Sequence, residues 1–184
     1  MSNLIAIAST SQLAIIDMQT KLSSVMQADA MQKVAKNCSI LAQAANLLEV
    51  PIIATEQYPQ RLGETLPEIS QHFSNVKPIA KTAFSACGEP KFNQHLHRDK
   101  AQIMIAGMEA HICVLQTALD LLQQGKQVFV VEDAVISREA NNKNNALARL
   151  CEAGCVITNT ESVWFEWLGD ANHEAFKALS KLIR

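Results

Sequence analysis

Three residues in separate parts of the chain carry side chains suited to nucleophilic catalysis. Cys113 lies shortly after an apolar stretch that ends at Gly107, so we expect it in the first turn of the following helix. Unpaired backbone N–H groups and the positive end of the helix dipole favour a thiolate there, and the same N–H groups can stabilise an oxyanion. Asp17 ends another apolar stretch, and Lys81 follows a third. These residue types predict a cysteine nucleophile assisted by an acid and an amine.

Each of the three residues also has an ordinary structural explanation. A cysteine such as Cys113 often packs as a small hydrophobe. The Asp17 side chain can cap a loop instead of facing a cleft. A lone lysine such as Lys81 is usually a solvated surface charge. The catalytic interpretation therefore depends on a fold that brings all three together.

The elements that would position these residues are parallel strands joined by crossover helices. Short apolar runs alternate with longer segments of helical period, which is the pattern of an α/β fold. An open parallel sheet binds its ligand beyond the carboxyl ends of its strands, where Asp17 and the turn from Gly107 to Cys113 are expected. The polar stretch 55–80 contains three prolines and is expected to form a pocket wall. The predicted strands cover residues 12–17, 51–54, 101–107, 127–131 and 154–158. The predicted helices cover residues 29–48, 110–124 and 141–153, with one or two more in 162–184.

Length and composition predict one compact domain, residues 1–184. Of these 184 residues, 48% are hydrophobic and 18% are charged, which is enough apolar material for a substantial core. A formal net charge of -2 gives no basic field, so neither nucleic acid nor an anionic membrane is an expected partner. No apolar run approaches the ~20 residues that span a bilayer, and no basic residue precedes Lys21, so no signal peptide is expected. Five scattered cysteines, an odd number, predict reduced thiols and a cytoplasmic location.

Several short motifs together resemble the isochorismatase-like (cysteine hydrolase) superfamily. They are Leu13-Ala-Ile-Ile-Asp-Met-Gln19, Lys81-Thr-Ala-Phe-Ser85 and Ala106-Gly-Met-Glu-Ala-His-Ile-Cys-Val114, and they follow one another in the order of that family. Further segments are similar to the branch of isochorismatase domain-containing proteins. These segments are Thr55-Glu-Gln-Tyr-Pro59, Gln116-Thr-Ala-Leu-Asp120 and Ala146-Leu-Ala-Arg-Leu150. The resemblance runs from about Leu13 to the C-terminus.

The resemblance implies a fold and a chemistry. The fold is a single-domain, three-layer α/β/α Rossmann-like architecture with a six-stranded parallel sheet in the order 3-2-1-4-5-6. The implied catalytic triad is Cys113, Asp17 and Lys81. A cis peptide bond is expected between Met108 and Glu109, so that the amides of Glu109 and Cys113 point at the oxyanion. The implied activity is hydrolysis of a small carboxamide or related acyl substrate through a thioester, by a protein that forms homo-oligomers.

The resemblance also suggests residues around the substrate. We expect the Glu109 carboxylate to point aside, because a negative charge beside Cys113 would raise the pKa of the nucleophile. Trp164 can be a pocket wall, although core packing or a subunit contact is the alternative for it. The expected pocket walls are Gln19, Gln57, Tyr58, Phe84, His111 and Trp164.

No metal ion and no cofactor are expected. Metal-dependent nicotinamidases of the superfamily carry an aspartate and histidine cluster after the second strand, whereas this chain reads Thr55-Glu-Gln-Tyr-Pro-Gln-Arg61 there and has no histidine before His72. His95 and His97 have strand-like spacing, but their polar neighbours indicate a solvated surface.

Two other functions remain open from sequence. In the first, Asp17 is the general acid of an isochorismatase-type vinyl ether hydrolase and Cys113 is idle. In the second, the chain is a non-catalytic binding or thiol-sensing protein that keeps the fold.

Overall fold

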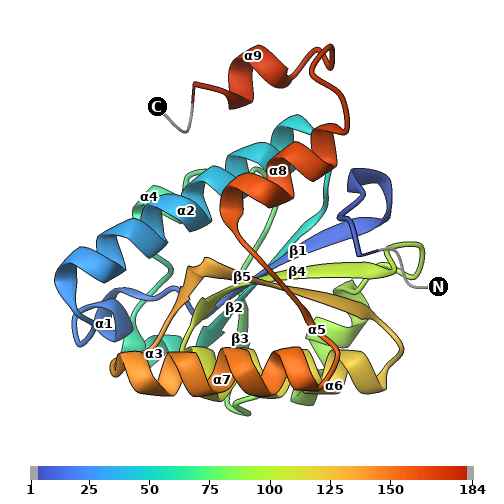
Figure 1. The fold of residues 1–184 in the computed structure, drawn as a ribbon. Helices are drawn as coiled ribbons and strands as arrows, with labels where there is room; N and C mark the ends of the chain where they lie inside the picture. Colours follow the sequence, from blue (N-terminus) through green and yellow to red (C-terminus); the bar gives the residue numbers. More distant parts are fainter. Residues whose placement is uncertain (1–3, 182–184) are drawn as a thin grey trace.

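The computed structural model describes residues 4–181 and shows a six-stranded, all-parallel sheet with helices on both faces (Figure 1). The strands lie side by side in the order β3-β2-β1-β4-β5-β6, which confirms the expected topology. The strands are β1 (Ser11–Ile16), β2 (Ile52–Gln57), β3 (Ile79–Lys81), β4 (Gln102–Met108), β5 (Gln127–Ile136) and β6 (Val156–Thr158).

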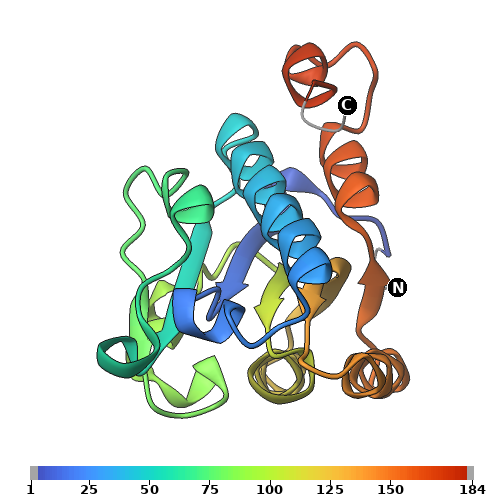
Figure 2. The same cartoon turned by 90° about the vertical axis from the view of Figure 1, so that its left-hand side faces the viewer.

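Long helices form the two outer layers. One face of the sheet is covered by α2 (Ala28–Leu47) and α8 (Thr160–Leu168), and the other by α6 (Leu115–Gln123) and α7 (Ala140–Glu152) (Figures 1 and 2). No helix within residues 4–181 combines the length and apolar character needed to cross a membrane. The shorter elements are η1 (Ala8–Thr10), α1 (Thr20–Ser23), α3 (Pro59–Leu62), α4 (Pro67–Ser70), η2 (Ala86–Gly88), α5 (Pro90–His95), η3 (Ala110–Val114) and α9 (Phe176–Leu179).

The strand β1 shows why the sheet lies between two helical layers. All six of its residues are buried. Leu13 and Ile15 pack in the core under α2, whereas Ala14 and Ile16 pack in the core on the opposite face. Successive side chains of a strand point to opposite faces, so a strand that is covered on both sides reads as a continuous apolar run.

Gly107 allows β1 and β4 to approach closely. Its φ of 127° lies in a region that L side chains rarely adopt, and a Cβ atom at this position would overlap the carbonyl oxygen of Ile16. The glycine therefore stands at the point where the ends of the two central strands meet.

Several elements differ from their sequence-based predictions; for example, β2 runs to Gln57 instead of residue 54. The strand β5 continues to Ile136, whereas the prediction ended it at Val131. The polar pair Glu132 and Asp133 interrupts the apolar run at an irregularity in the β4–β5 register, and the apolar run resumes after it. The predicted helix 110–124 is divided into the π-helical turn η3 and the helix α6. The predicted closing helices in 162–184 are α8, which begins at Thr160, and α9; residues 182–184 lie outside the described part of the chain.

Cys38 on α2 is a buried thiol whose ionisation opposes folding. Its side chain is fully buried, and its Sγ donates to the carbonyl oxygen of Ala134 at 3.4 Å. Burial raises the pKa of this thiol far above its usual range, and the negative charge of Asp133 raises it further. The folded state therefore keeps the proton at pH values where the unfolded chain has lost it.

We expect alkaline pH to destabilise the protein partly through Cys38. The pKa of Cys38 is higher in the folded protein than in the unfolded chain, where it is about 9. The stability that the protonated thiol contributes is therefore complete below pH 9 and is lost as the pH rises above that value. Between pH 7.5 and pH 10 this loss is about 1.4 kcal/mol per buried thiol. Urea denaturation should therefore show a smaller pH dependence for Cys38→Ala than for the wild type, whereas Cys151→Ala, at an exposed thiol, should keep the wild-type dependence. Equal slopes for wild type and Cys38→Ala would contradict this prediction.

Candidate active site

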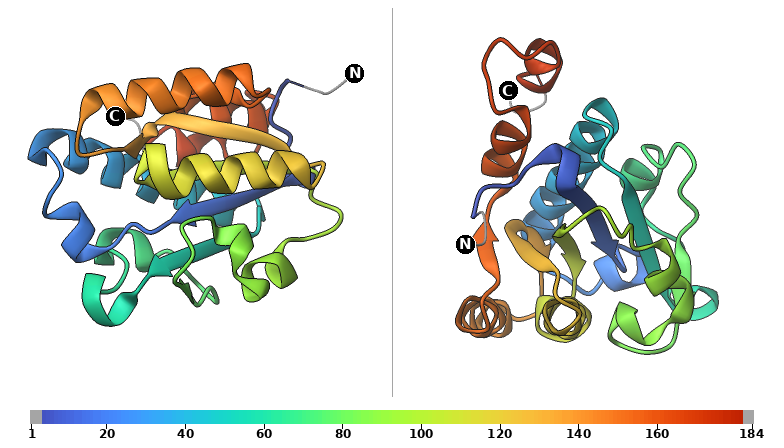
Figure 3. Two further views of the ribbon diagram at one scale, coloured as in Figure 1. Left: turned by 90° about the horizontal axis from the view of Figure 1, so that it is seen from below. Right: turned by 90° about the vertical axis from the view of Figure 1, so that its right-hand side faces the viewer.

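The three predicted catalytic residues lie at or just beyond the carboxyl ends of three parallel strands, the central pair β1 and β4 and the edge strand β3. Asp17 directly follows β1, Lys81 is the last residue of β3, and Cys113 lies in η3, which follows β4. The strands β3, β2, β1 and β4 are neighbours in that order, and Figure 3 shows their layer from two further directions. The fold thus brings together three residues that are far apart in the sequence.

Asp17 is a buried carboxylate whose charge is paired with that of Lys81. Its Oδ2 atom lies 2.7 Å from the Nζ atom of Lys81, and its Oδ1 atom accepts a hydrogen bond of 2.7 Å from the Thr55 hydroxyl. Its backbone N–H donates to the Thr55 carbonyl oxygen at 3.1 Å, and its φ is 50°. Within the described residues Oδ2 makes no further hydrogen bond, so this oxygen depends on the ion pair with Lys81 for compensation of its buried charge.

Lys81 is held in the interior instead of extending into solvent. Its side chain has 0% exposure. Besides the ion pair with Asp17, its Nζ atom donates to Gln57 Oε1 at 2.6 Å and to the carbonyl oxygens of Ala83 and Phe84 at 3.1 Å each. These contacts rule out the surface-charge explanation for Lys81 and fix the ammonium beside the carboxylate.

Gln19 and Gln57 build the scaffold around this ion pair. The Gln19 amide donates to the carbonyl oxygens of Gln57 at 3.0 Å and Gly63 at 2.6 Å, and its Oε1 accepts from the Gln57 N–H at 2.7 Å. The Gln57 amide donates to the Thr82 carbonyl oxygen at 2.8 Å. Both were expected as pocket walls, but their polar atoms hold backbone groups and Lys81 in place.

Cys113 lies against the ion pair as a protonated thiol. It is only 7% exposed, and the side chains of Asp17 and Lys81 both act on the pKa of its thiol. Burial raises its pKa to about 12, the charge of Asp17 also raises it, and the charge of Lys81 lowers it. The expected thiolate is therefore not the resting state, because burial and the neighbouring carboxylate outweigh the first-turn environment. A reaction at this sulfur needs a base.

The turn before Cys113 has the expected backbone form. The peptide bond between Met108 and Glu109 is cis. The carbonyl oxygen of Glu109 accepts from the N–H groups of Ile112 at 3.0 Å and Val114 at 3.3 Å, so this residue closes the turn that contains the sulfur.

The Glu109 carboxylate points to Arg138, as expected for a group that avoids Cys113. The backbone N–H of Arg138 donates to its Oε2 atom at 3.0 Å, and Nε lies 3.2 Å from both carboxylate oxygens. His111 Nδ1 makes a 2.9 Å hydrogen bond with the Ser137 hydroxyl. Sequence reasoning missed Arg138 because it ended β5 at residue 131; the strand-end rule, applied to the full strand, would have found it.

The three aromatic residues expected around the substrate lie in different places. Tyr58 and Phe84 are 47% and 56% exposed, and the backbone of each contacts Lys81. The Tyr58 N–H donates to the Lys81 carbonyl oxygen at 3.0 Å, and the Phe84 carbonyl oxygen accepts a hydrogen bond from Lys81 Nζ. Trp164, a residue of α8, is 1% exposed and packs in the core on the α2 side of the sheet. The pocket-wall prediction for Trp164 is wrong and its alternative, core packing, is correct, because α8 covers the face opposite η3.

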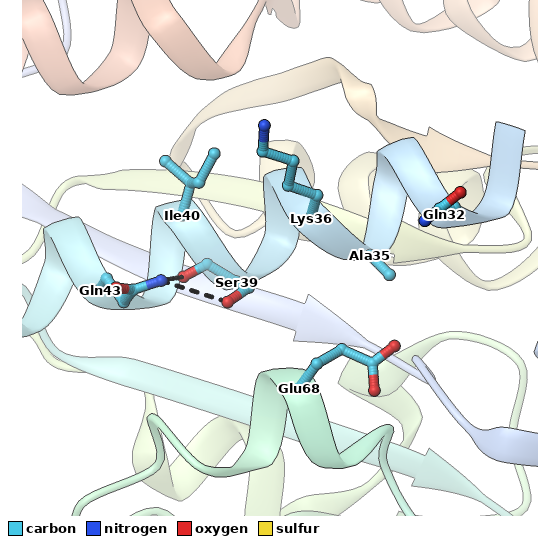
Figure 4. Close-up of a pocket in the computed structure, with 7 residues that line it drawn as sticks. All are labelled: Gln32, Ala35, Lys36, Ser39, Ile40, Gln43 and Glu68. Atoms are coloured by element: carbon cyan, nitrogen blue, oxygen red, sulfur yellow. Dashed lines mark hydrogen bonds between the residues drawn. The ribbon is translucent and has the colours of Figure 1, made fainter. Parts of the chain in front are cut away.

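Several cavities have walls that include none of Cys113, Asp17 and Lys81. A groove of about 380 Å³ runs along the outer face of α2, where Glu68 of α4 forms the opposite wall (Figure 4). A cleft of about 430 Å³ lies between the start of α2 and the turn after β5, and Ser137, Arg138 and Lys143 contribute to its lining. Within residues 4–181, no three His, Cys, Asp or Glu side chains are grouped to hold a metal ion.

Comparison with known proteins gives consistent matches over nearly the whole chain. Residues 11–162 match the model of the isochorismatase domain family. The chain is 36% identical over 175 residues to isochorismatase domain-containing protein 2 of Bos taurus, and the alignment covers 95% of this chain and 83% of that protein.

Two solved structures have the same fold. The MAR1 ribonuclease of Caenorhabditis elegans has a TM-score of 0.92 and 34% identity, with 97% of this chain and 92% of that chain covered. YcaC from Pseudomonas aeruginosa, described with hexane-2,5-diol and covalent acrylamide, has a TM-score of 0.88 and 26% identity, with 100% and 97% covered.

Proposed function

The chain belongs to the isochorismatase family of hydrolases, and from this premise we propose that it cleaves a small carboxamide or related acyl substrate through a thioester on Cys113. One observation carries the proposal: the buried thiol of Cys113 is next to the ion pair formed by Asp17 and Lys81, and both of these charged groups act on its pKa. A nucleophile next to a base that is itself oriented by a third group is the arrangement of covalent catalysis.

In the proposed mechanism, Asp17 is the base that the protonated Cys113 needs. As Asp17 Oδ2 accepts the thiol proton, the sulfur attacks the carbonyl carbon and forms a tetrahedral intermediate. Backbone N–H groups of the turn from Glu109 to Cys113 stabilise the oxyanion, and each such donor contributes ~2.7 to 4 kcal/mol to lowering the barrier. Asp17 then returns the proton to the leaving nitrogen, the C–N bond breaks, and the thioester remains.

The second half of the reaction reuses the same groups. Asp17 accepts a proton from water, whose oxygen attacks the thioester carbon, and the acid product leaves as the proton returns to the sulfur. Lys81 holds the carboxylate at the sulfur throughout and supplies a positive charge beside the intermediate. We propose that the exposed rings of Tyr58 and Phe84 border the entrance for the substrate.

Mass spectrometry of the intact protein tests the proposal. After incubation with p-nitrophenyl acetate or with a panel of small primary amides, we expect one acyl group per chain, mapped to the peptide that contains Cys113. Cys87→Ala is the control, because Cys87 is another partly buried thiol outside the triad and its loss should leave acylation intact. Absence of an adduct with every probe, or an adduct on another cysteine alone, would contradict a thioester at Cys113.

A second candidate activity keeps Asp17 as the acid and leaves Cys113 idle. The family name favours it, and turnover of isochorismate that survives Cys113→Ala would support it over the thioester route. The C. elegans structure is called a ribonuclease. An RNA substrate therefore belongs in the same test, although a net charge of -2 does not favour a polyanionic ligand.

We also propose a cytoplasmic homo-oligomer. All five cysteines are free thiols in the structure, in agreement with a reducing compartment. Exposed apolar side chains, among them Val25, Phe84 and Phe165, offer surface for a second copy of the chain.

A further inference from the structure

We propose that Arg138 is a positioning residue for this chemistry: it holds the carboxylate of Glu109, and through it the turn whose backbone N–H groups face the oxyanion. The inference rests on the proposed function, since it assigns a task within the same site. It concerns a residue that touches neither the sulfur nor the ion pair of Asp17 and Lys81.

The first observation is the way in which Arg138 holds the carboxylate. The Glu109 side chain is 8% exposed, whereas that of Arg138 is 55% exposed. The carboxylate therefore needs a partner more than the guanidinium does, because a nearly buried charge without compensation is strongly unfavourable. Nε lies equally close to both oxygens, and the backbone N–H adds a third contact, so the carboxylate can neither rotate nor translate freely.

The second observation is that the same two segments meet twice. His111, two residues after Glu109, is hydrogen-bonded to Ser137, the residue before Arg138. Two contacts from alternate residues of one turn to adjacent residues of another fix orientation as well as distance. The end of β5 thereby holds the turn that follows β4.

The third observation connects this contact to the sulfur. The carbonyl oxygen of Glu109 accepts the N–H groups of Ile112 and Val114, which lie on either side of Cys113. A shift of Glu109 therefore moves the backbone around the nucleophile. Displacements of about 1 Å in such a constellation typically slow a reaction by about 100-fold.

The positive charge of Arg138 also neutralises the Glu109 carboxylate near the site. The thiol of Cys113 already feels the negative charge of Asp17, which opposes its ionisation. A released Glu109 carboxylate would add another negative charge where the oxyanion forms, and like charges oppose each other most strongly in a site with little water. Arg138 keeps that carboxylate turned away and neutralised.

Two reactions of the same sulfur separate positioning from general damage. Acylation by p-nitrophenyl acetate forms the C–S bond, releases p-nitrophenolate and passes through an oxyanion. Alkylation by iodoacetamide forms a C–S bond and releases iodide without any oxyanion. In both reactions the thiol proton leaves to a base. A loss of oxyanion stabilisation slows the first reaction alone, whereas a disordered or inaccessible site slows both.

For Arg138→Met we expect acylation to fall by about 10- to 100-fold while alkylation at the same pH changes by less than about 3-fold. Methionine keeps most of the aliphatic volume and removes the charge and the Nε donor. Arg138→Lys should recover part of the acylation rate because it keeps the charge. Arg149→Met, at an exposed arginine on α7, is the matched control and should react at wild-type rates.

The double variant Glu109→Gln/Arg138→Met completes the test. If the two side chains act as one unit, it should acylate no more slowly than Arg138→Met alone. Equal losses in both reactions, or unchanged acylation in Arg138→Met and Arg138→Lys, would overturn the role of Arg138 while the proposed function stands. A wild-type protein that iodoacetamide alkylates at Cys113 but that no acyl probe modifies would overturn the proposed function and this inference with it.

Discussion

Cys113→Ala is expected to abolish hydrolysis of an acyl substrate, with kcat reduced on the order of 10⁴-fold or more, and to leave the fold intact. The change removes the sulfur on which the thioester would form. It also removes the only step in which Asp17 acts as base toward a protein group. Steady-state kinetics with p-nitrophenyl acetate, or with an amide that acylates the wild type, measures the loss.

The same variant should be almost as stable as the wild type. The side chain is small, only 7% exposed, and neutral at pH 7, because burial and Asp17 raise its pKa to about 12. Removing one buried sulfur atom leaves a small cavity that costs about 1 kcal/mol. Thermal unfolding followed by circular dichroism checks this, with Cys87→Ala as the control that should retain both fold and activity. A Cys113→Ala protein with full turnover would exclude the covalent route and favour Asp17 acting alone.

Most of the fold could be predicted because a strand that is buried on both faces has apolar residues at nearly every position. The run from Leu13 to Ile16 is apolar at every position since each residue faces one of the two cores. The end of β5 was missed for the opposite reason. Glu132 and Asp133 interrupt the apolar run at an irregularity in the strand, and only the pairing with β4 shows that the strand continues.

The meeting of Asp17 with the turn that leads to Cys113 could be predicted because strand-end residues of a parallel sheet lie at one edge. The position of Lys81 beside them was expected from the family resemblance. The state of Cys113 could not be predicted. The first-turn argument considers the helix alone, whereas the pKa depends on burial and on Asp17, which approaches from another strand. The role of Arg138 and the core position of Trp164 also depend on contacts between distant segments. The alternative interpretation of Trp164 was open from sequence, but only the packing of α8 decided it.

The ion pair between Lys81 and Asp17 is the second place where a single substitution should have a large effect. Lys81→Met is expected to lower the free energy of unfolding by about 3 to 5 kcal/mol, because it leaves a buried carboxylate without its cation. Asp17→Asn should lower it less, since the ammonium keeps the carbonyl oxygens of Ala83 and Phe84 as acceptors. Urea denaturation measures both, with Asp99→Asn as the control at an ion pair whose carboxylate is exposed, where a loss of at most about 1 kcal/mol is expected.

The double variant Asp17→Asn/Lys81→Met separates what the pair does for stability from what it does for catalysis. Both buried charges are gone, so part of the stability lost in Lys81→Met should return. Activity should not return, because asparagine cannot accept the thiol proton; general base catalysis alone contributes about 10²- to 10⁴-fold. A double variant that is no more stable than Lys81→Met would mean that packing, not charge, dominates the pair. A double variant that turns over substrate would remove Asp17 as the base, and with it the reason why a thiol with so high a pKa can act as a nucleophile.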